Sequence, residues 1–274
     1  MTSKDHLMAV AQAMSTFTAR CTNLIVGFDP AARDQVRPVG SGTLVEIPDR
    51  GSFILTAAHV IHDAAAYETV LHALGPGSER MGICPGENYC LVGAQSQEDA
   101  DHGVDHARVD VGVIRPERFG GDGLEPLPVD PFMSGEHTSA GLEGELLFVT
   151  GFPGQGLQAL IGGVFTERRS WCTVLAEPEP GFNPELHLFL KHAATEDVEV
   201  FDTDGRPARA DRHLPDGLSG SPVWCTSAGA EGWEPSRARI VGVVTRWSQD
   251  GRTLIATRIE VVRDRLLAFL QQDS

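Results

Sequence analysis

Three short segments place a histidine, an aspartate and a serine in settings that suit nucleophilic catalysis. His59 stands in LTAAHV, directly after an apolar run, Asp110 stands in VDVGVI, and Ser219 stands in DGLSGSPV. A serine hydroxyl becomes a nucleophile when a histidine accepts its proton, and an aspartate can fix the tautomer of that histidine. The three residue types therefore predict acyl-transfer chemistry, provided that the fold brings them together.

Asp110 is the residue whose surroundings most need an explanation. A lone carboxylate inside an apolar strand is costly to bury unless it is paired, and a histidine Nδ1–H is a suitable partner. An aspartate at an edge strand or in a turn would explain the pattern without catalysis. Asp101 and Asp105 lie nearby, but both stand in a polar stretch without an apolar frame. His59 is one of ten histidines, so its segment alone is weak evidence.

The segment around Ser219 is the most specific of the three. Glycines on both sides permit a tight turn in which the N–H groups of Gly217 and Ser219 point at one position, as an oxyanion hole requires. Gly220 lets the chain pass closely behind the nucleophile. Ser221 is a rival nucleophile, but it lacks a glycine two residues before it. A turn rich in glycine and serine without a catalytic role is the ordinary alternative.

The order of the segments separates two classes of hydrolase. His59 precedes Asp110 by 51 residues, and Asp110 precedes Ser219 by 109. In α/β-hydrolases the order is serine, aspartate, histidine, and their G-x-S-x-G turn would need a glycine where this chain has Ser221. Ser219 also precedes an apolar strand rather than a helix. An esterase or lipase on that fold is therefore disfavoured.

Short apolar segments separated by Gly, Pro and Asp must position these residues, and their number predicts a barrel or a sandwich. The expected strands are NLIVGF (23–28), GTLVEI (42–47), SFILTAA (52–58), ELLFVTGF (145–152), LHLFLKH (186–192), RIVGVVTRW (239–247) and TLIATRI (253–259). Apolar residues at helical spacing predict amphipathic helices in 4–20 and 260–272. Long surface loops are expected at 74–104, 117–142 and 202–217.

Charge and cysteine content restrict the partners and the compartment. The formal net charge of −16 disfavours a nucleic-acid partner and an anionic membrane surface, because both need a surplus of Lys and Arg. The five cysteines have no metal-binding spacing, and no stretch resembles a secretory signal or a membrane span. We therefore expect no metal, free thiols and a cytoplasmic location. A disulfide between Cys84 and Cys90 is the alternative for an exported protein.

The segments LTAAHV, DVGVI and GLSGSPVW, in this order, resemble the three sequence blocks of the trypsin/chymotrypsin superfamily of serine peptidases. GSGTLVEI, VTGFPG and IVGVVTRW resemble further strands of that superfamily, and the likeness covers about residues 22–272. Within that superfamily, the sequence resembles the stand-alone, disulfide-poor bacterial trypsin-like peptidases, and it shares features with glutamyl endopeptidases. The resemblance implies an all-β fold of two six-stranded Greek-key β-barrels, with short N-terminal and C-terminal helices.

The resemblance also implies an activity and a division of the chain. It implies a serine endopeptidase that hydrolyses protein or peptide substrates through an acyl-enzyme on Ser219, without an organic cofactor. His59, Asp110 and Ser219 would form its catalytic triad. The expected segments are a helical extension at 1–20, a first barrel at 21–135, a second barrel at 136–259 and a terminal helix at 260–274.

Five residues are expected to contact the substrate on the same basis: His213, Val244, Thr245, Arg246 and Leu254. His213 stands where trypsin carries the aspartate that selects Lys or Arg, and Val244 where glutamyl endopeptidases carry a histidine, so neither preference is supported. Leu254 would fill the pocket floor. Arg246 would reach the rim, where it either favours acidic residues beside the cut or is simply solvated. We expect a shallow apolar pocket that takes small or medium aliphatic residues.

The sequence leaves open how the activity is regulated. Leu218 stands where trypsin-like zymogens carry an aspartate that pairs with a newly cut N-terminus, so activation by that kind of cleavage is not expected. A catalytically inactive trypsin-fold binding module, or a regulatory pseudopeptidase, is the alternative to an enzyme. A cytoplasmic peptidase needs a restraint or a narrow substrate, so a regulatory partner protein from the same operon is a further hypothesis.

Overall fold

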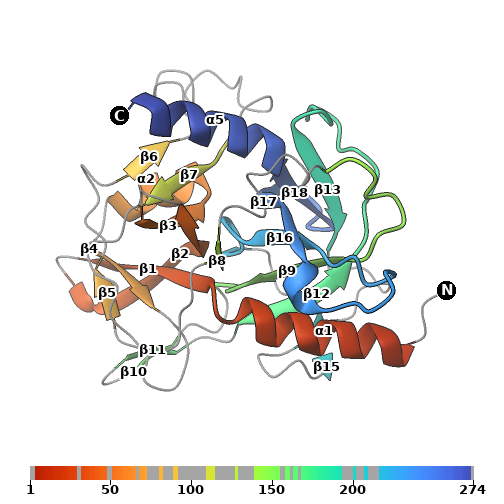
Figure 1. The fold of residues 1–274 in the computed structure, drawn as a ribbon. Helices are drawn as coiled ribbons and strands as arrows, with labels where there is room; N and C mark the ends of the chain where they lie inside the picture. Colours follow the sequence, from red (N-terminus) through yellow and green to blue (C-terminus); the bar gives the residue numbers. More distant parts are fainter. Residues whose placement is uncertain are drawn as a thin grey trace.

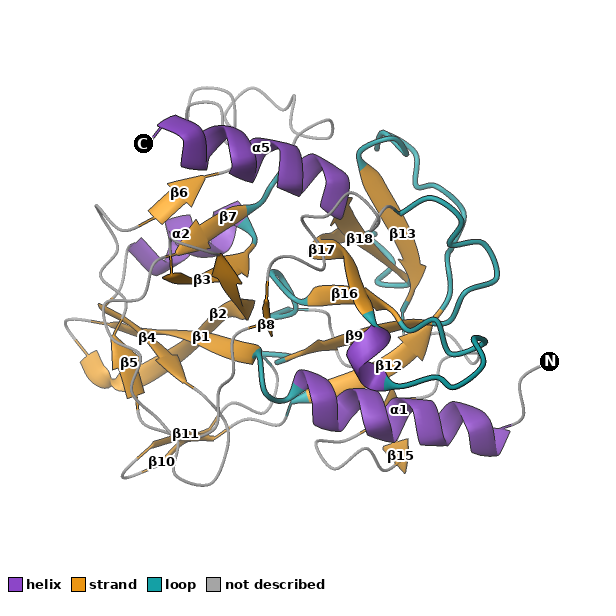
Figure 2. Cartoon of the chain, in the orientation of Figure 1, coloured by secondary structure: helices purple, strands orange, loops and turns teal. Residues whose placement is uncertain are grey.

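Two large β-sheets lie side by side in a computed structural model of the chain, and helices lie along the edges of the molecule (Figure 1). The model describes residues 4–29, 32–47, 51–65, 68–72, 80–82, 89–91, 109–114, 127–128, 139–154, 158–160, 163–165, 168–192, 200–201, 207–208 and 216–272. Strands make up most of the described elements, as Figure 2 shows. The all-β class predicted from the short apolar segments is confirmed.

The first sheet has the strand order β5-β4-β1-β2-β3-β7-β6, and β8 pairs with β2. Neighbouring strands are antiparallel except for the short β2–β8 pair. Its strands are β1 (Thr22–Asp29), β2 (Ala32–Ile47), β3 (Gly51–Thr56), β4 (Glu68–His72), β5 (Arg80–Gly82), β6 (Tyr89–Leu91), β7 (Gly112–Ile114) and β8 (Leu127–Pro128).

The second sheet has the strand order β13-β18-β17-β16-β9-β12-β14-β15, and every pair in it is antiparallel. Its strands are β9 (Leu147–Gly151), β12 (Arg169–Thr173), β13 (His187–Lys191), β14 (Val200–Phe201), β15 (Pro207–Ala208), β16 (Pro222–Cys225), β17 (Arg239–Trp247) and β18 (Thr253–Arg258). A separate two-stranded sheet consists of β10 (Gln158–Leu160) and β11 (Gly163–Phe165).

Each large sheet contains eight strands, where the sequence predicts six in each barrel. The short members β5, β6, β8, β14 and β15 have two or three residues each, which is too few to give an alternating pattern in a sequence. The strands expected at 23–28, 42–47 and 239–247 all lie within observed strands. Most of the expected loops at 74–104, 117–142 and 202–217 lies outside the described residues.

Helices flank the two sheets. They are α1 (Lys4–Thr18), α2 (Ala58–Ala65), the 3₁₀ helix η2 (Pro235–Arg237) and α5 (Ile259–Gln272). The terminal helices α1 and α5 were expected at nearly these bounds, whereas α2 replaces the end of a strand expected to reach residue 58. In Figure 1, α5 crosses the top of the molecule toward β6 and β7, and α1 runs below β12. Among the described residues, each helix is too short or too polar to cross a bilayer.

The main hydrophobic core joins these parts. It contains buried side chains from both sheets and from both terminal helices, among them Met14, Phe53, Phe148, Trp224 and Leu266. Successive side chains of β3 and β9 point to opposite faces of their sheets. Phe53, Leu55 and Phe148 therefore enter this core, whereas Ile54, Leu147 and Val149 are buried in two other clusters. The two sheets therefore share a buried core, and the segments with His59, Asp110 and Ser219 are attached to its edges.

Candidate active site

His59 lies in the first turn of α2, immediately after β3. Small residues make this position possible, because Ala57 and Ala58 are buried and leave room for a sharp change of direction. The N–H of Ala58 donates to the carbonyl oxygen of Asp110 at 3.3 Å, which fixes the start of α2 beside the segment that leads into β7. The sequence predicted the histidine but not the helix that carries it.

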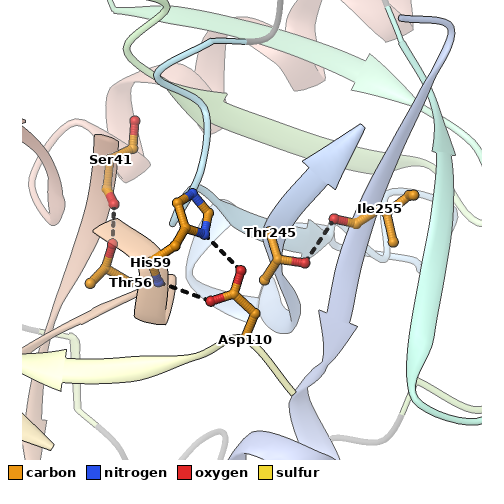
Figure 3. Close-up of polar contacts among 6 residues, drawn as sticks. All are labelled: Ser41, Thr56, His59, Asp110, Thr245 and Ile255. Carbon is orange, nitrogen blue, oxygen red and sulfur yellow. Dashed lines mark hydrogen bonds and ion pairs between the residues drawn. The ribbon is translucent and has the colours of Figure 1, made fainter. Parts of the chain in front are cut away.

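His59 and Asp110 are joined by two hydrogen bonds (Figure 3). The backbone N–H of His59 donates to Asp110 Oδ1 at 2.9 Å, and the imidazole Nδ1 lies 2.6 Å from Asp110 Oδ2. The side chain of Asp110 is 11% exposed and that of His59 is 40% exposed. Val109 and Val111, which flank Asp110, are buried in the main core. Both oxygens of the Asp110 carboxylate thus accept a hydrogen bond from His59, while part of the imidazole ring stays exposed to solvent.

The pKa of Asp110 lies below its usual value. Burial alone would raise this pKa, but the hydrogen bond and charge of His59, the backbone N–H of His59 and the charge of Arg246 together outweigh burial. Asp110 is therefore a carboxylate at neutral pH. An ionised Asp110 can accept from Nδ1–H, which leaves Nε2 of His59 as the ring nitrogen that can accept a proton.

Ser219 lies in a tight turn directly before β16. Gly217 and Gly220 have φ values of +86° and +87°, a region that side-chain-bearing residues seldom adopt. A Cβ on Gly220 would lie 1.9 Å from the carbonyl oxygen of Ser41 and 2.2 Å from Thr56 Oγ1. Both glycines are thus required by the backbone angles, and Gly220 also by the close approach of the first sheet.

Ser41, in β2, organises this turn from the other sheet. Its backbone N–H donates to the carbonyl of Ser219 at 2.7 Å, and its hydroxyl donates to the carbonyl of Gly217 at 2.8 Å. The same hydroxyl accepts from the N–H of Phe152 at 2.9 Å. Thr56 in turn donates to the carbonyl of Ser41 at 2.7 Å (Figure 3). Sequence reasoning missed Ser41, although a serine between two glycines in an apolar strand is an unusual pattern.

The hydrogen bonds that the turn makes with described residues account for all of its carbonyl groups but not for all of its N–H groups. The carbonyls of residues 216–219 all accept hydrogen bonds, and the N–H groups of Gly220 and Ser221 both donate. Within the described part of the chain, the N–H groups of residues 217–219 donate to no acceptor. Two of these, on Gly217 and Ser219, are the donors that the sequence predicted for an oxyanion hole.

The two candidate nucleophiles differ in their surroundings. Ser221 is fully buried, and its Oγ lies only 1.9 Å from the position that a Cβ on Gly151 would occupy. Ser219 is also buried, but it keeps 4% of its surface exposed. Its hydroxyl makes no hydrogen bond within the described residues, so the contact between Ser219 and His59 is not formed in this structure. Such contacts are often loose in unliganded enzymes and tighten with substrate.

Gly40 links the Ser219 turn to the histidine segment. A Cβ at this position would lie 2.8 Å from the carbonyl oxygen of Ser219 and 2.6 Å from Cγ2 of Val60, the residue after His59. The turn and the start of α2 therefore both pack against the same few atoms of β2. The structure brings all three predicted segments to one place, with His59 and Asp110 in direct contact.

The residues expected to contact substrate have different environments. Val244 and Leu254 are fully buried in a core cluster that also contains Leu218. Thr245 is buried, and its hydroxyl donates to the carbonyl of Ile255 at 3.4 Å (Figure 3). Arg246 is partly exposed, and its charge acts on Asp110. His213 lies outside the described residues, as do the rival aspartates at 101 and 105.

Three of the cysteines are described with their side chains, and all three are buried and form no disulfide: Cys21, Cys172 and Cys225. Burial raises the pKa of Cys21 to about 12, so this thiol stays protonated. Cys84 and the side chain of Cys90 lie outside the described parts, so their pairing stays a prediction. Among the described residues, no three His, Cys, Asp or Glu side chains are grouped to hold a metal ion.

Comparison with known proteins adds evidence on the fold. No protein-family model and no curated protein matches the sequence. The structure of the VesB protease of Vibrio cholerae matches with a TM-score of 0.50 at 12% identity, over 92% of this chain and 64% of that one. The fold is that of chymotrypsin-like serine proteases. At this identity the likeness concerns the fold alone, and it agrees with the resemblance noted in the sequence.

Two structures of the Rv3671c protease from M. tuberculosis also match. The active form has a TM-score of 0.45 and 16% identity, over 94% of this chain and 85% of that chain. The inactive form has a TM-score of 0.45 and 14% identity, over 95% of this chain and 91% of that chain. Any catalytic role within the chymotrypsin-like fold must therefore be argued from the residues of this chain.

Proposed function

We propose that the chain is a serine endopeptidase that hydrolyses peptide bonds through an acyl-enzyme on Ser219. The observation that supports this most is the double hydrogen bond between His59 and Asp110, held next to a glycine turn in which the N–H groups of Gly217 and Ser219 have no acceptor among the described residues. A merely structural histidine would not need a partly buried carboxylate on Nδ1 with its opposite edge accessible.

In the proposed reaction, Ser219 Oγ attacks the carbonyl carbon of the substrate while His59 Nε2 takes the hydroxyl proton. Asp110 keeps the proton on Nδ1 and stabilises the imidazolium. The N–H groups of Gly217 and Ser219 stabilise the oxyanion, each by about 3 kcal/mol. His59 then protonates the leaving amine, and water releases the acyl group by the same route in reverse.

We propose the type of substrate side chain that the site accepts from the buried residues of the second sheet. Val244 and Leu254 are fully buried in an apolar cluster, and apolar surroundings of this kind suit small or medium aliphatic side chains. Cys21, Cys172 and Cys225 form no disulfide, which is consistent with a reducing compartment, and we propose a cytoplasmic location for this reason.

Labelling with a fluorophosphonate probe tests the proposal directly, because the probe reacts only with an activated serine. The full-length wild type should react, and Ser219→Ala should lose both labelling and peptide hydrolysis while remaining folded. Ser221→Ala is the matched control. It should keep both activities and unfold at an equal or higher urea concentration, because its buried Oγ has no partner in the described structure and its removal relieves an unsatisfied group.

An inactive binding module is the second candidate, and one observation favours it. The hydroxyl of Ser219 makes no hydrogen bond to His59 in this structure, although both hydrogen bonds between His59 and Asp110 are in place. A folded wild type that reacts with no fluorophosphonate and cleaves no peptide would favour this second candidate. Labelling that persists in Ser219→Ala would instead show that the nucleophile is assigned to the wrong residue.

A further inference from the structure

The hydroxyl of Ser41 connects the segment after β9 with the turn before β16, although Ser41 itself lies in β2 of the first sheet. The hydroxyl oxygen accepts from the N–H of Phe152 at 2.9 Å, and the hydroxyl donates to the carbonyl oxygen of Gly217 at 2.8 Å. Ser41 is 0% exposed, so its hydroxyl is out of contact with solvent. The single donor of this side chain is therefore committed to the carbonyl of Gly217.

The two predicted oxyanion donors belong to peptide groups whose carbonyls are held by backbone N–H groups. The carbonyl of Asp216 accepts from the N–H of Gly154 at 2.7 Å, and the carbonyl of Leu218 accepts from the N–H of Ser221 at 2.9 Å. In a planar trans peptide group the C=O and the N–H point in opposite directions. Each of these hydrogen bonds therefore also fixes the direction of the N–H on the following residue, which is one of the two donors.

Ser41 holds the peptide group that lies between those two. This group starts at Gly217, whose φ is +86°, and a glycine loses more conformational freedom on folding than any other residue. A rotation of the middle peptide group would change the angle between the N–H of Gly217 and the N–H of Ser219. The hydrogen bond from Ser41 thus restrains the part of the turn that glycine leaves most free to rotate.

The segment after β9 encloses the same glycine. A Cβ on Gly217 would lie 2.5 Å from the carbonyl oxygen of Phe152 and 2.6 Å from the backbone nitrogen of Gly154. β9 also pairs with β16, the strand that follows the turn. The VTGFPG segment that the sequence analysis singled out therefore packs against the turn, and Ser41 joins the two through one hydroxyl.

We propose that Ser41 is a positioning residue for the proposed peptide hydrolysis, because its hydroxyl holds the N–H groups of Gly217 and Ser219 in the orientation that stabilises the oxyanion. This inference rests on the proposed endopeptidase function. Ser41 acts through the Gly217 peptide group and not on the substrate itself. The negative charge develops only in the transition state, so loss of the Ser41 hydroxyl lowers the rate of the chemical step and leaves substrate binding nearly unchanged.

Ser41→Ala in the full-length protein tests this proposal with a fluorogenic peptide amide that has alanine before the leaving group. The kcat should fall about tenfold or more, while KM stays within about twofold of the wild-type value. Affinity for a peptide trifluoromethyl ketone of the same sequence should fall by a similar factor, because Ser219 adds to its carbonyl carbon and forms an oxyanion in the same place. The acid limb of the pH profile of kcat/KM should not move, since the hydroxyl of Ser41 bonds to neither His59 nor Asp110 in the described structure.

A second variant and a matched control separate positioning from general stability. Ser41→Cys nearly preserves the volume of the side chain, but a thiol is a weaker donor, so its kcat should lie between those of the wild type and Ser41→Ala. It replaces Ser41→Ala if the alanine variant does not fold. Ser170→Ala is the control, because Ser170 is also 0% exposed and its hydroxyl donates to Thr150 Oγ1 at 3.0 Å. Ser170→Ala should unfold at a lower urea concentration than the wild type and keep its kcat.

Wild-type kcat in Ser41→Ala and Ser41→Cys would overturn the inference. An equal loss of kcat in Ser170→Ala would also overturn it, because the effect would then be one of general loosening. Fluorophosphonate labelling distinguishes failure of the inference from failure of the proposed function. A labelled, active wild type with Ser41 variants of unchanged kcat refutes only the role of Ser41, whereas an unlabelled, inactive wild type refutes the proposed function and the inference together.

Discussion

At the scale of single residues, the contacts that Asp110 makes with His59 affect the folding stability of the chain as well as the candidate active site. Its carboxylate accepts from both the backbone and the ring of His59, and these contacts keep its pKa below that of an aspartate in the unfolded chain. Between the two pKa values the unfolded chain binds more protons than the folded one. The contribution of this pair to the free energy of unfolding is therefore fully present above the pKa of Asp110 in the unfolded chain. It is lost as the pH falls through the pKa of Asp110 in the folded chain.

Asp110→Asn should accordingly be less stable than the wild type at pH 5, and the difference should shrink as the pH falls below about 4, where aspartate in an unfolded chain becomes protonated. Urea unfolding at pH 5, 4 and 3 measures this. Asp63→Asn, an exposed change on α2, removes the same charge without these contacts and is the control. If the difference in unfolding free energy between Asp110→Asn and the wild type stays constant or grows toward pH 3, the lowered pKa of Asp110 is contradicted.

Residues that act through distant contacts could not be found from spacing. Ser41 is 176 residues from Gly217, yet its hydroxyl orders the Ser219 turn. His59, Asp110 and Ser219 were found because each sits in a local pattern that is unusual in itself: a histidine after an apolar strand, a carboxylate within one, and a serine between glycines.

At the scale of elements, the glycine turn should tolerate almost no change. Gly220→Ala combines an unfavourable φ with overlap against Ser41 and Thr56. Gly251 is the matched control, because its φ is +70° and nothing lies within 4 Å of an added Cβ. Gly251→Ala should cost about 1–2 kcal/mol of unfolding free energy, from backbone strain alone.

Gly220→Ala should cost about 1–3 kcal/mol more than the control, from overpacking, and it should also lose fluorophosphonate labelling. Urea unfolding of both variants, followed by labelling under native conditions, checks this. Equal stability of the two alanine variants would show that the contact between the turn and β2 is not as close as described.

Elements with long periodic patterns were predictable, and short ones were not. The strands β1, β3, β9, β17 and β18 have five or more residues and each contains a run of at least three apolar or glycine residues, which is enough to identify them. The segment SFILTAA was expected to be a strand throughout, but the chain turns into α2 at Ala58. Alanine and histidine fit either structure, so the contact of Ala58 with Asp110, which is non-local, decides the outcome.

At the scale of the whole molecule, α1 is part of the core rather than an appendage. Met14 is fully buried, Phe17 makes an edge-to-face contact with Trp224 at 5.8 Å, and Arg168 Nη2 donates to the carbonyl of Ser15 at 2.9 Å. The helix contacts β9, β12 and η2 of the second half of the chain. Stability of the second sheet should therefore depend on it.

Met14→Ala should lower the unfolding free energy by about 2–5 kcal/mol, the usual cost of truncating a buried methionine. Met8→Ala is the control, because Met8 is only partly buried on the same helix and should cost clearly less. Chemical denaturation of the two variants at pH 7 measures the difference. Equal losses would mean that α1 does not pack as described.

The same packing bears on activation. Leu218, at the position where an ion pair would form in trypsin-like zymogens, is buried among apolar side chains. We therefore expect the uncut chain with Met1 intact to be active, and removal of residues 1–20 to abolish folding rather than to switch on hydrolysis. Labelling of full-length and trimmed protein decides between these outcomes. A trimmed protein that gains activity over an inert full-length chain would refute the expectation.

The bonds from Ser41 to the Ser219 turn have a consequence for biosynthesis. A ribosome releases the N-terminal part of a chain first, so β2, with Ser41, emerges long before the turn that it holds. β17, which anchors the turn from the other side through Val244, emerges later still. A nascent or prematurely terminated chain therefore contains His59 and Asp110 without a formed nucleophile turn. The candidate nucleophile turn is therefore complete only once the C-terminal strands of the second sheet have been released.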